Sequence, residues 1–274
     1  MLHPSVRYCF QGEARLNFGD ALPELLAELF VPNSPPVVKA DVIRLVGSVI
    51  DPKWMEEDLK HGEILSYWGC GMRQGLTLIA KYHCQNFPAV RGPLTRSLLN
   101  LHPSTPTGDS GFLLPLIYPR NPFRSSGTIA IPHINELRDW DGIKNSTGVD
   151  EVITPWVIGD HENLKLKLID KISIIAHSEF VLTGSLHGAV IAAAYGVPFA
   201  FWNSGYINVP FKWVDFASSL HIPCKFVSNL KEGQEWYEEI KPRMKKIDLR
   251  ALLASAPFPV KPMYYQKLDI LGYW

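Results

Sequence analysis

The strongest chemical signal in the sequence is His187, which follows a short apolar run and opens a stretch of small residues. Residues 180–182 are typical of a strand inside a parallel sheet, and Ser185 supplies a hydroxyl where a helix should begin. His187 then lies in the first helical turn, where free backbone N–H groups and the helix dipole favour an anion. An imidazole beside a bound phosphate can exchange a proton near neutral pH. A packed or solvated histidine at a helix start fits the same position, and both interpretations remain open.

Arg91 has a similar place, because it ends the predicted strand 87–91 and comes directly before the predicted helix 94–99. A guanidinium at the carboxyl end of a strand can form paired hydrogen bonds to a phosphate or a carboxylate. A single arginine is more often a solvated side chain. The sequence therefore gives Arg91 as a candidate anion-binding residue, with the solvated surface residue as the alternative.

Asn17 and Asp20 lie in a polar loop between the first predicted strand, 6–10, and the amphipathic segment 21–30. In one interpretation the loop faces a ligand from the end of that strand. In the other, Asp20 only caps the helix, since Pro23 suits a first helical turn.

The composition limits the classes of function. The chain of 274 residues has 46% hydrophobic residues and no formal net charge, which predicts a well-filled core. Its basic residues are scattered, which argues against a nucleic-acid surface. The four cysteines lack the spacing of a zinc site or a disulfide framework, and no apolar run approaches the ~20 residues of a membrane span. We therefore expect a cytoplasmic protein, soluble or peripheral at the inner face of the membrane.

Predicted strands alternate with predicted helices along the chain, which indicates parallel sheets with right-handed crossovers. The segment 119–127 is rich in Pro, Ser and Gly and predicts a linker between domains at 1–122 and 123–274, with the tail 249–274 crossing back. The glycines after residue 68 have the spacing GxGxxxG without a following acidic partner, so we reject a dinucleotide site. The predicted strands are 6–10, 42–50, 64–68, 87–91, 128–131, 152–157, 180–182, 199–201 and 224–227, and the predicted helices include 21–30, 94–99, 163–176, 211–220, 232–246 and 249–254.

Seven short motifs occur in an order that resembles the polysaccharide pyruvyltransferase family. They are NFGDALPELL (17–26), WGCG (68–71), VRGPLTRSLL (90–99), GDSGFLLP (108–115), IPHINE (131–136), SLHGAVIAAAYGVP (185–198) and FKW (211–213). Each motif is short, and their order along nearly the whole chain is the specific part of the resemblance.

The resemblance implies an α/β fold with two Rossmann-like domains facing across a cleft, as in GT-B glycosyltransferases. It also implies transfer of the enolpyruvyl group of phosphoenolpyruvate to a sugar of an exopolysaccharide or capsule precursor, free or lipid-linked, as a ketal. Lys212 matches the family's donor-binding lysine, and Glu136 is the match for an acidic residue that serves as base. Many members carry arginine directly before Leu-His, where this chain has Ser185. Arg91 and Lys212 must then supply more of the positive charge.

These residue types suit that chemistry. A phosphate and a carboxylate need cationic partners and helix N-terminal amides. Ketal formation also needs a proton on the donor's methylene carbon and a proton removed from a sugar hydroxyl, and His187 is the candidate for one step. The residues demand no metal or cofactor. The alternatives are a GT-B glycosyltransferase that uses a nucleotide sugar and a catalytically silent glycan-binding relative, because a shared fold does not fix the chemistry.

Overall fold

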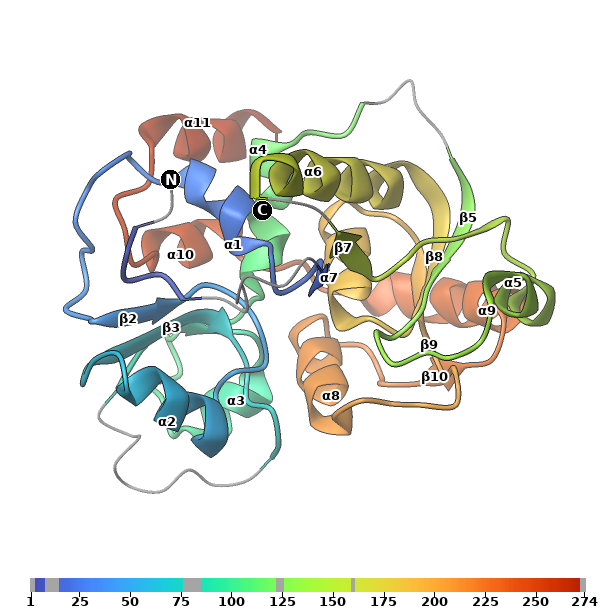
Figure 1. The fold of residues 1–274 in the computed structure, drawn as a ribbon, viewed down its shortest axis with the longest axis horizontal. Helices are drawn as coiled ribbons and strands as arrows, with labels where there is room; N and C mark the ends of the chain where they lie inside the picture. The colour runs from blue at the N-terminus through green and yellow to red at the C-terminus, as the bar shows by residue number, and fades with distance from the viewer. Residues whose placement is uncertain (1–2, 8–14, 76–84, 122–125, 159–160, 272–274) are drawn as a thin grey trace.

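The computed structural model describes residues 3–7, 15–75, 85–121, 126–158 and 161–271. It shows a Rossmann-like α/β fold with one three-stranded and one five-stranded parallel sheet, which lie side by side in Figure 1. The predicted α/β class with parallel sheets is therefore confirmed. No helix in the described part of the chain is long and apolar enough to cross a membrane.

The first half of the chain forms the three-stranded sheet. Val6 extends this sheet through a parallel bridge to Ile43, and Thr107 extends the other edge through a bridge to Val90. Because the strands are parallel, the loops that follow their carboxyl ends all lie at one edge of the sheet. The strands are β2 (Val42–Arg44), β3 (Leu65–Cys70) and β4 (Asn86–Val90), and the helices beside them are α2 (Pro52–Leu59) and α3 (Pro93–Leu98).

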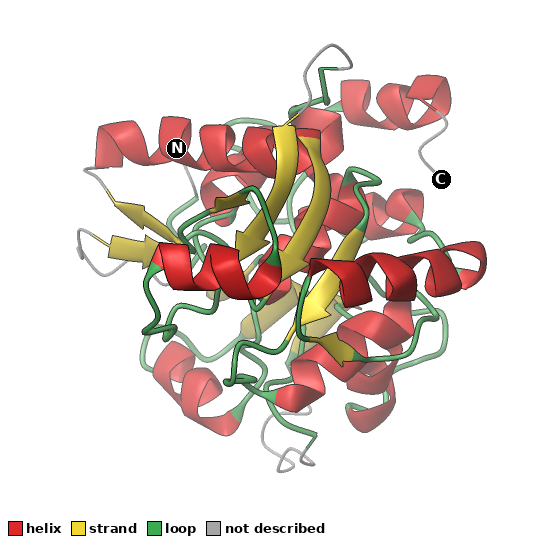
Figure 2. Ribbon diagram, turned by 90° about the vertical axis from the view of Figure 1, so that its right-hand side faces the viewer, coloured by secondary structure: helices red, strands yellow, loops and turns green. Residues whose placement is uncertain are grey.

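The second half forms the five-stranded sheet, in the order β10-β9-β8-β5-β6. The strands are β5 (Ser126–Ile131), β6 (Glu151–Val152), β8 (Ser178–Thr183), β9 (Phe199–Trp202) and β10 (Phe226–Val227). Helices α6 (His161–His177) and α7 (Leu186–Ala194) cover one face, and α5 (Trp140–Thr147) and α9 (Leu230–Ile240) cover the other (Figures 1 and 2).

The strand order of this sheet reverses between β5 and β8. The chain leaves β5 toward β6 at one edge and leaves β8 toward β9 on the other side. Ligands of open α/β sheets bind beyond the carboxyl ends of strands at such a reversal. The loops that begin at Pro132 and Gly184 lie at this place.

Several segments join the two halves. Strand β1 (Arg15–Asn17) pairs antiparallel with β7 (Trp156–Ile158). One continuous buried core includes apolar side chains from both sheets. The remaining elements are α1 (Pro23–Leu26), the 3-10 turns η1 (Ala27–Leu29), η3 (Ser110–Leu113) and η4 (Lys241–Arg243), and α4 (Leu114–Ile117), α8 (Pro210–Ser219), α10 (Leu249–Ala254) and α11 (Pro262–Leu271).

The C-terminal segment packs on the first half. The indole nitrogen of Trp68 donates to the carbonyl of Leu252 at 3.1 Å, and the backbone N–H of Lys261 donates to the carbonyl of Leu29 at 2.9 Å. The division into domains at residues 122 and 123 stays a prediction.

Several predicted elements differ from the structure. The predicted helix 21–30 is the short helix α1 followed by the 3-10 turn η1. The predicted strand 42–50 ends at Arg44, because the chain turns at Gly47, whose φ of +111° is unfavourable for other residues. The predicted strand 152–157 is two strands, β6 and β7, and the predicted helix 232–246 ends at Ile240, two residues before Pro242. Residues 8–10 of the first predicted strand lie outside the described residues.

Candidate active site

His187 lies in the first turn of α7, directly after β8, as the sequence predicted. The residue is 7% exposed, and its Nε2 atom makes no hydrogen bond to any described residue. Burial lowers the pKa of the imidazole, and together with the positive charges of Lys212 and Arg91 it brings this pKa to about 3. His187 is therefore neutral at physiological pH until an anion offsets these effects.

Asp109 faces His187 from the first half of the chain. Its Oδ2 atom lies 3.9 Å from His187 Nε2 and makes no hydrogen bond within the described part of the chain. The other oxygen, Oδ1, accepts the backbone N–H of Gly111 at 2.9 Å, so Asp109 is the N-cap of η3. Burial raises the pKa of this carboxyl to about 6, against the lowering effect of the Gly111 hydrogen bond and of Arg91.

Arg91 directly follows β4 and is completely buried. Its guanidinium donates to Ser48 Oγ at 2.7 Å and to the carbonyl of Met72 at 3.1 Å. The Nε atom lies 3.5 Å from Asp215 Oδ2 and has no hydrogen-bond partner among the described residues. The alternative that Arg91 is a solvated surface residue is therefore wrong, and its charge is buried.

Asp215 of α8 ties Arg91 to α3. Its carboxylate accepts the backbone N–H of Thr95 at 2.9 Å and the Thr95 hydroxyl at 2.7 Å. These bonds span 120 residues of sequence. They fix the beginning of α3 against α8, and thereby hold Arg91 near the second half of the chain.

Lys212 lies in the first turn of α8 and adds a second cation. Burial lowers its pKa to about 8, as does repulsion from Arg91 and Arg73, while Asp20 acts in the opposite direction. Asp20 in turn has a pKa raised by burial, which Lys212 partly offsets. Asp20 does not cap α1, whose N-cap is Leu22 without a side-chain hydrogen bond. The capping interpretation of Asp20 is thus wrong.

The loop from Asn17 to Asp20 covers the imidazole. Asn17 Oδ1 accepts the backbone N–H of Gly19 at 3.1 Å, which folds the loop into a tight turn. A Cβ atom on Gly19 would lie 1.9 Å from His187 Nδ1, so only glycine allows this approach. The structure therefore brings Asn17, Asp20, Arg91, His187 and Lys212 together.

Ser185 is the N-cap residue of α7 by position, but its hydroxyl makes no capping hydrogen bond. Instead, Thr183 Oγ1 accepts the backbone N–H of Ser185 at 3.0 Å and donates to the Ser185 carbonyl at 2.7 Å. Gly188 packs against Thr183, and Gly184 lies near the backbone of His133. These two glycines allow close packing of protein atoms.

Glu136 lies in the loop after β5 and forms an ion pair with Arg138 at 3.0 Å. The Arg138 guanidinium holds the pKa of Glu136 at about 2, so the paired carboxylate is a weak base. No hydrogen bond or ion pair joins Glu136 to His187 among the described residues. Three residues earlier, burial and the charge of Lys212 lower the pKa of the His133 imidazole to about 4.

Asp109, His133, Arg73 and Asp215 were missed by sequence reasoning. The motifs GDSG and IPHINE contain Asp109 and His133, so those motifs gave a signal that we did not resolve to single residues. Arg73 and Asp215 carry no local signal. In the described part of the chain, no three His, Cys, Asp or Glu side chains group as metal ligands.

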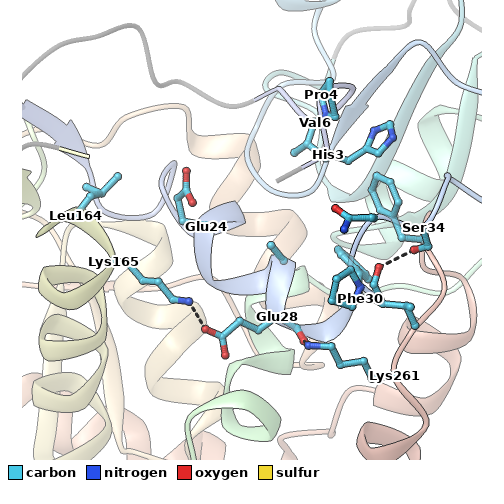
Figure 3. A pocket seen from close by; sticks show the side chains of 15 residues that line it. His3, Pro4, Val6, Glu24, Glu28, Phe30, Ser34, Leu164, Lys165 and Lys261 are labelled. Atoms are coloured by element: carbon cyan, nitrogen blue, oxygen red, sulfur yellow. Dashed lines mark hydrogen bonds and ion pairs between the residues drawn. The ribbon is translucent and has the colours of Figure 1, made fainter. Parts of the chain in front are cut away.

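A cavity of about 680 Å³ lies elsewhere, beside α1 and α6 (Figure 3). Within it, Lys165 forms an ion pair with Glu28, and Lys261 donates to the Glu28 carbonyl at 2.7 Å. None of the predicted site residues lines this cavity. The cluster and the cavity therefore share none of the predicted site residues.

The family model of the polysaccharide pyruvyl transferases matches residues 65–202, half of the chain. The chain belongs to the polysaccharide pyruvyl transferase family. The match runs from β3 to β9 and includes Arg91, Asp109, Glu136 and His187, whereas the loop of Asn17 and Lys212 lie outside it. The name of the family implies a pyruvyltransferase with a polysaccharide substrate.

The chain is also similar to the succinoglycan biosynthesis protein ExoV of Rhizobium meliloti (strain 1021). The two are 24% identical over 206 residues, which cover 75% of this chain and 62% of the relative. The chain thus spans less than two thirds of the length of ExoV. No solved structure matches the chain significantly.

Proposed function

We propose that this chain transfers the enolpyruvyl group of phosphoenolpyruvate to a sugar of an exopolysaccharide or capsule precursor, forming a pyruvate ketal. The observation that carries the proposal is the cluster of buried Arg91 and His187 with partly buried Lys212 in a member of a pyruvyl transferase family. Buried cations without a full set of carboxylate partners favour an anionic ligand, because its charge offsets their desolvation.

The donor offers charges that fit this cluster. Its phosphate and carboxylate would pair with Lys212 and Arg91, and the N-terminus of α7 adds backbone N–H groups. In the reaction, one proton of the sugar diol passes to the methylene carbon of the donor, which becomes a methyl group. Both sugar oxygens bond to the central carbon, and the phosphate leaves with the second proton. His187 is the residue that we assign to proton transfer.

The proposed role of Glu136 as base on the acceptor hydroxyl needs a further condition. In its ion pair with Arg138 the carboxylate has a pKa of about 2. The role therefore requires that acceptor binding separates Glu136 from Arg138. Replacement of Glu136 by glutamine tests it, because unchanged turnover would exclude Glu136 as the base.

We also propose that the two sheets belong to two Rossmann-like domains, 1–122 and 123–274, arranged as in GT-B enzymes. The support is that each sheet is separate and that the site residues come from both halves. Two transitions in scanning calorimetry would support this arrangement, and one cooperative transition would argue for a single folding unit.

Ligand-dependent melting tests the donor. At 100 times its Kd, phosphoenolpyruvate should stabilise the protein by about 2.7 kcal/mol, which raises Tm by roughly 5–10 °C. A shift with UDP or GDP instead would favour the nucleotide-sugar transferase, and no shift with any of them would favour the silent glycan-binding relative. Incubation with candidate saccharides, free and lipid-linked, then tests transfer, because a ketal adds the mass of pyruvic acid minus one water.

A further inference from the structure

Two buried polar atoms face each other across the candidate site without a hydrogen bond. His187 Nε2 and Asp109 Oδ2 are 3.9 Å apart, and neither bonds to any other described residue. A buried donor or acceptor without a partner costs free energy, so each such atom in a native structure needs an explanation. Two of them facing each other indicate a contact that forms during function. We call these residues the Asp109–His187 pair.

The pair is held in place by its anchors. Asp109 keeps its orientation through the hydrogen bond from the Gly111 backbone to Oδ1, which leaves Oδ2 directed at the imidazole. His187 is fixed from the other side by Gly19, whose backbone lies against Nδ1. A shift of about 1 Å would therefore bring Nε2 and Oδ2 within ordinary hydrogen-bond distance.

The charges around the pair determine its protonation. Lys212 and Arg91 face the imidazole, and Lys212 is itself flanked by Asp20 and Arg73. Arg91, Asp215 and the buried thiol of Cys70 surround Asp109, and the pKa of that thiol is raised, so it stays neutral. With pKa values of about 6 for Asp109 and about 3 for His187, the pair at neutral pH is a carboxylate beside a neutral imidazole. This state can accept one proton.

We propose that Asp109 is the positioning residue of His187, an inference that rests on the proposed function. In the pair Nε2 carries the imidazole proton and donates it to Asp109 Oδ2. The proton of the acceptor hydroxyl is then taken at Nδ1 once the Gly19 backbone has moved aside, and the carboxylate stabilises the imidazolium. The imidazole then gives one proton to the methylene carbon of the donor, and the pair returns to its first state. The three negative charges of the bound donor add to the effect of Asp109, since both favour the charged imidazole.

The first test is the ionisation of His187 in the full-length protein, followed by NMR with labelled histidine while inorganic phosphate is added. Phosphate should raise the pKa of His187 in the wild type, and in Asp109→Asn this pKa should lie at least about one unit lower than in the wild type. The asparagine keeps an oxygen for the Gly111 N–H. If this variant does not fold, Asp109→Ser replaces it, because serine also caps.

The matched control is Asp58→Asn, which changes another buried carboxylate, one that binds Arg44 and Tyr67 and makes no hydrogen bond to His187. It should leave the pKa of His187 unchanged. An equal pKa in the wild type and the Asp109 variant would overturn the proposal. The NMR measurement does not depend on pyruvyl transfer. If the wild type forms no ketal, the proposed function is refuted, and the pKa of His187 still tests whether Asp109 acts on the imidazole.

The second test is a cycle of variants in the transfer assay. Asp109→Asn should lower kcat by roughly 10- to 10³-fold, with the KM for phosphoenolpyruvate changed less than about threefold, and should move the acid limb of the pH profile of kcat. In the His187→Gln background the same change should have almost no effect, because Asp109 acts through His187. An equal loss in both backgrounds would show that Asp109 has a separate role and would contradict the proposal.

Discussion

Two histidines of equal burial have opposite surroundings. His177, at the end of α6, is 7% exposed and has both ring nitrogens bonded, since Nδ1 donates to the Ser173 carbonyl at 2.6 Å and Nε2 accepts the Asn121 N–H at 3.0 Å. His187 is also 7% exposed, yet its Nε2 has no partner among the described residues. Burial alone therefore does not distinguish these two histidines, whereas the completeness of their hydrogen bonds does.

Two buried arginine–aspartate pairs repeat this contrast. Arg44 binds Asp58 through Nε at 3.1 Å to both oxygens and through NH2 at 2.5 Å, and the Tyr67 hydroxyl adds a bond of 3.0 Å. Arg91 lies 3.5 Å from Asp215, and its Nε atom lacks a hydrogen bond within the described residues. The first pair completes its own contacts and stabilises the fold. The second leaves one guanidinium nitrogen of Arg91 without a hydrogen bond in the described part of the chain, at the residue that we propose to bind the donor.

The largest expected effect comes from replacing each of the two histidines by glutamine in separate variants. His187→Gln should lower kcat by roughly 10²- to 10⁴-fold with little change in Tm, because glutamine donates hydrogen bonds but does not exchange protons. His177→Gln should instead destabilise the fold by about 1–3 kcal/mol with normal kcat per folded molecule. Steady-state kinetics and denaturant titration of both variants measure this. Normal turnover by His187→Gln would refute its role in proton transfer.

The next largest effect is expected on stability, at the fully bonded ion pair of Arg44 and Asp58. Asp58→Ala should reduce the free energy of unfolding by about 3–5 kcal/mol, because the buried Arg44 loses its carboxylate partner. Turnover per folded molecule should stay the same. The control is Glu57→Ala on the same helix, which removes an exposed carboxylate and should barely move the denaturation midpoint. Equal stability of the two variants would mean that the Arg44–Asp58 pair contributes little to the fold.

The smallest effect is expected at Lys212. This lysine, with a pKa of about 8, is charged below that pH and neutral above it, so affinity for phosphoenolpyruvate should fall as pH rises from 7 to 9. The donor's phosphate titrates near pH 6 and keeps its charge in that range. Lys212→Met should weaken donor binding by roughly 10- to 100-fold at pH 7 and flatten this dependence. Calorimetric titration measures both, with the exposed Lys231→Met as control. The same pH dependence in wild type and Lys212→Met would assign the titration to another group.

The sequence predicted the segment around His187 almost residue by residue. The apolar run, the alanine-rich helix and the Gly-Val-Pro stop are local signals, and β8, α7 and β9 follow them. Elsewhere, local propensity predicted a strand that was too long, because β2 ends at Arg44 and the chain turns at Gly47. The prediction of Asp109 as the partner of His187 was out of reach, because the two residues meet only when the halves of the chain dock. The same holds for Asp215 and Thr95, which are 120 residues apart.

The pairing of β1 with β7 has a consequence for the order of folding. Asn17 pairs with Trp156, and the next residues form the loop that covers His187. Asn17 and Trp156 are far apart in the sequence. Closing the loop between them costs more entropy than forming local helices or pairing neighbouring parallel strands, so we expect this pairing to form late. During synthesis the loop must also wait until β7 and then α7 have left the ribosome. We therefore expect the loop that covers His187 to be among the last parts of the molecule to assemble, after both sheets exist.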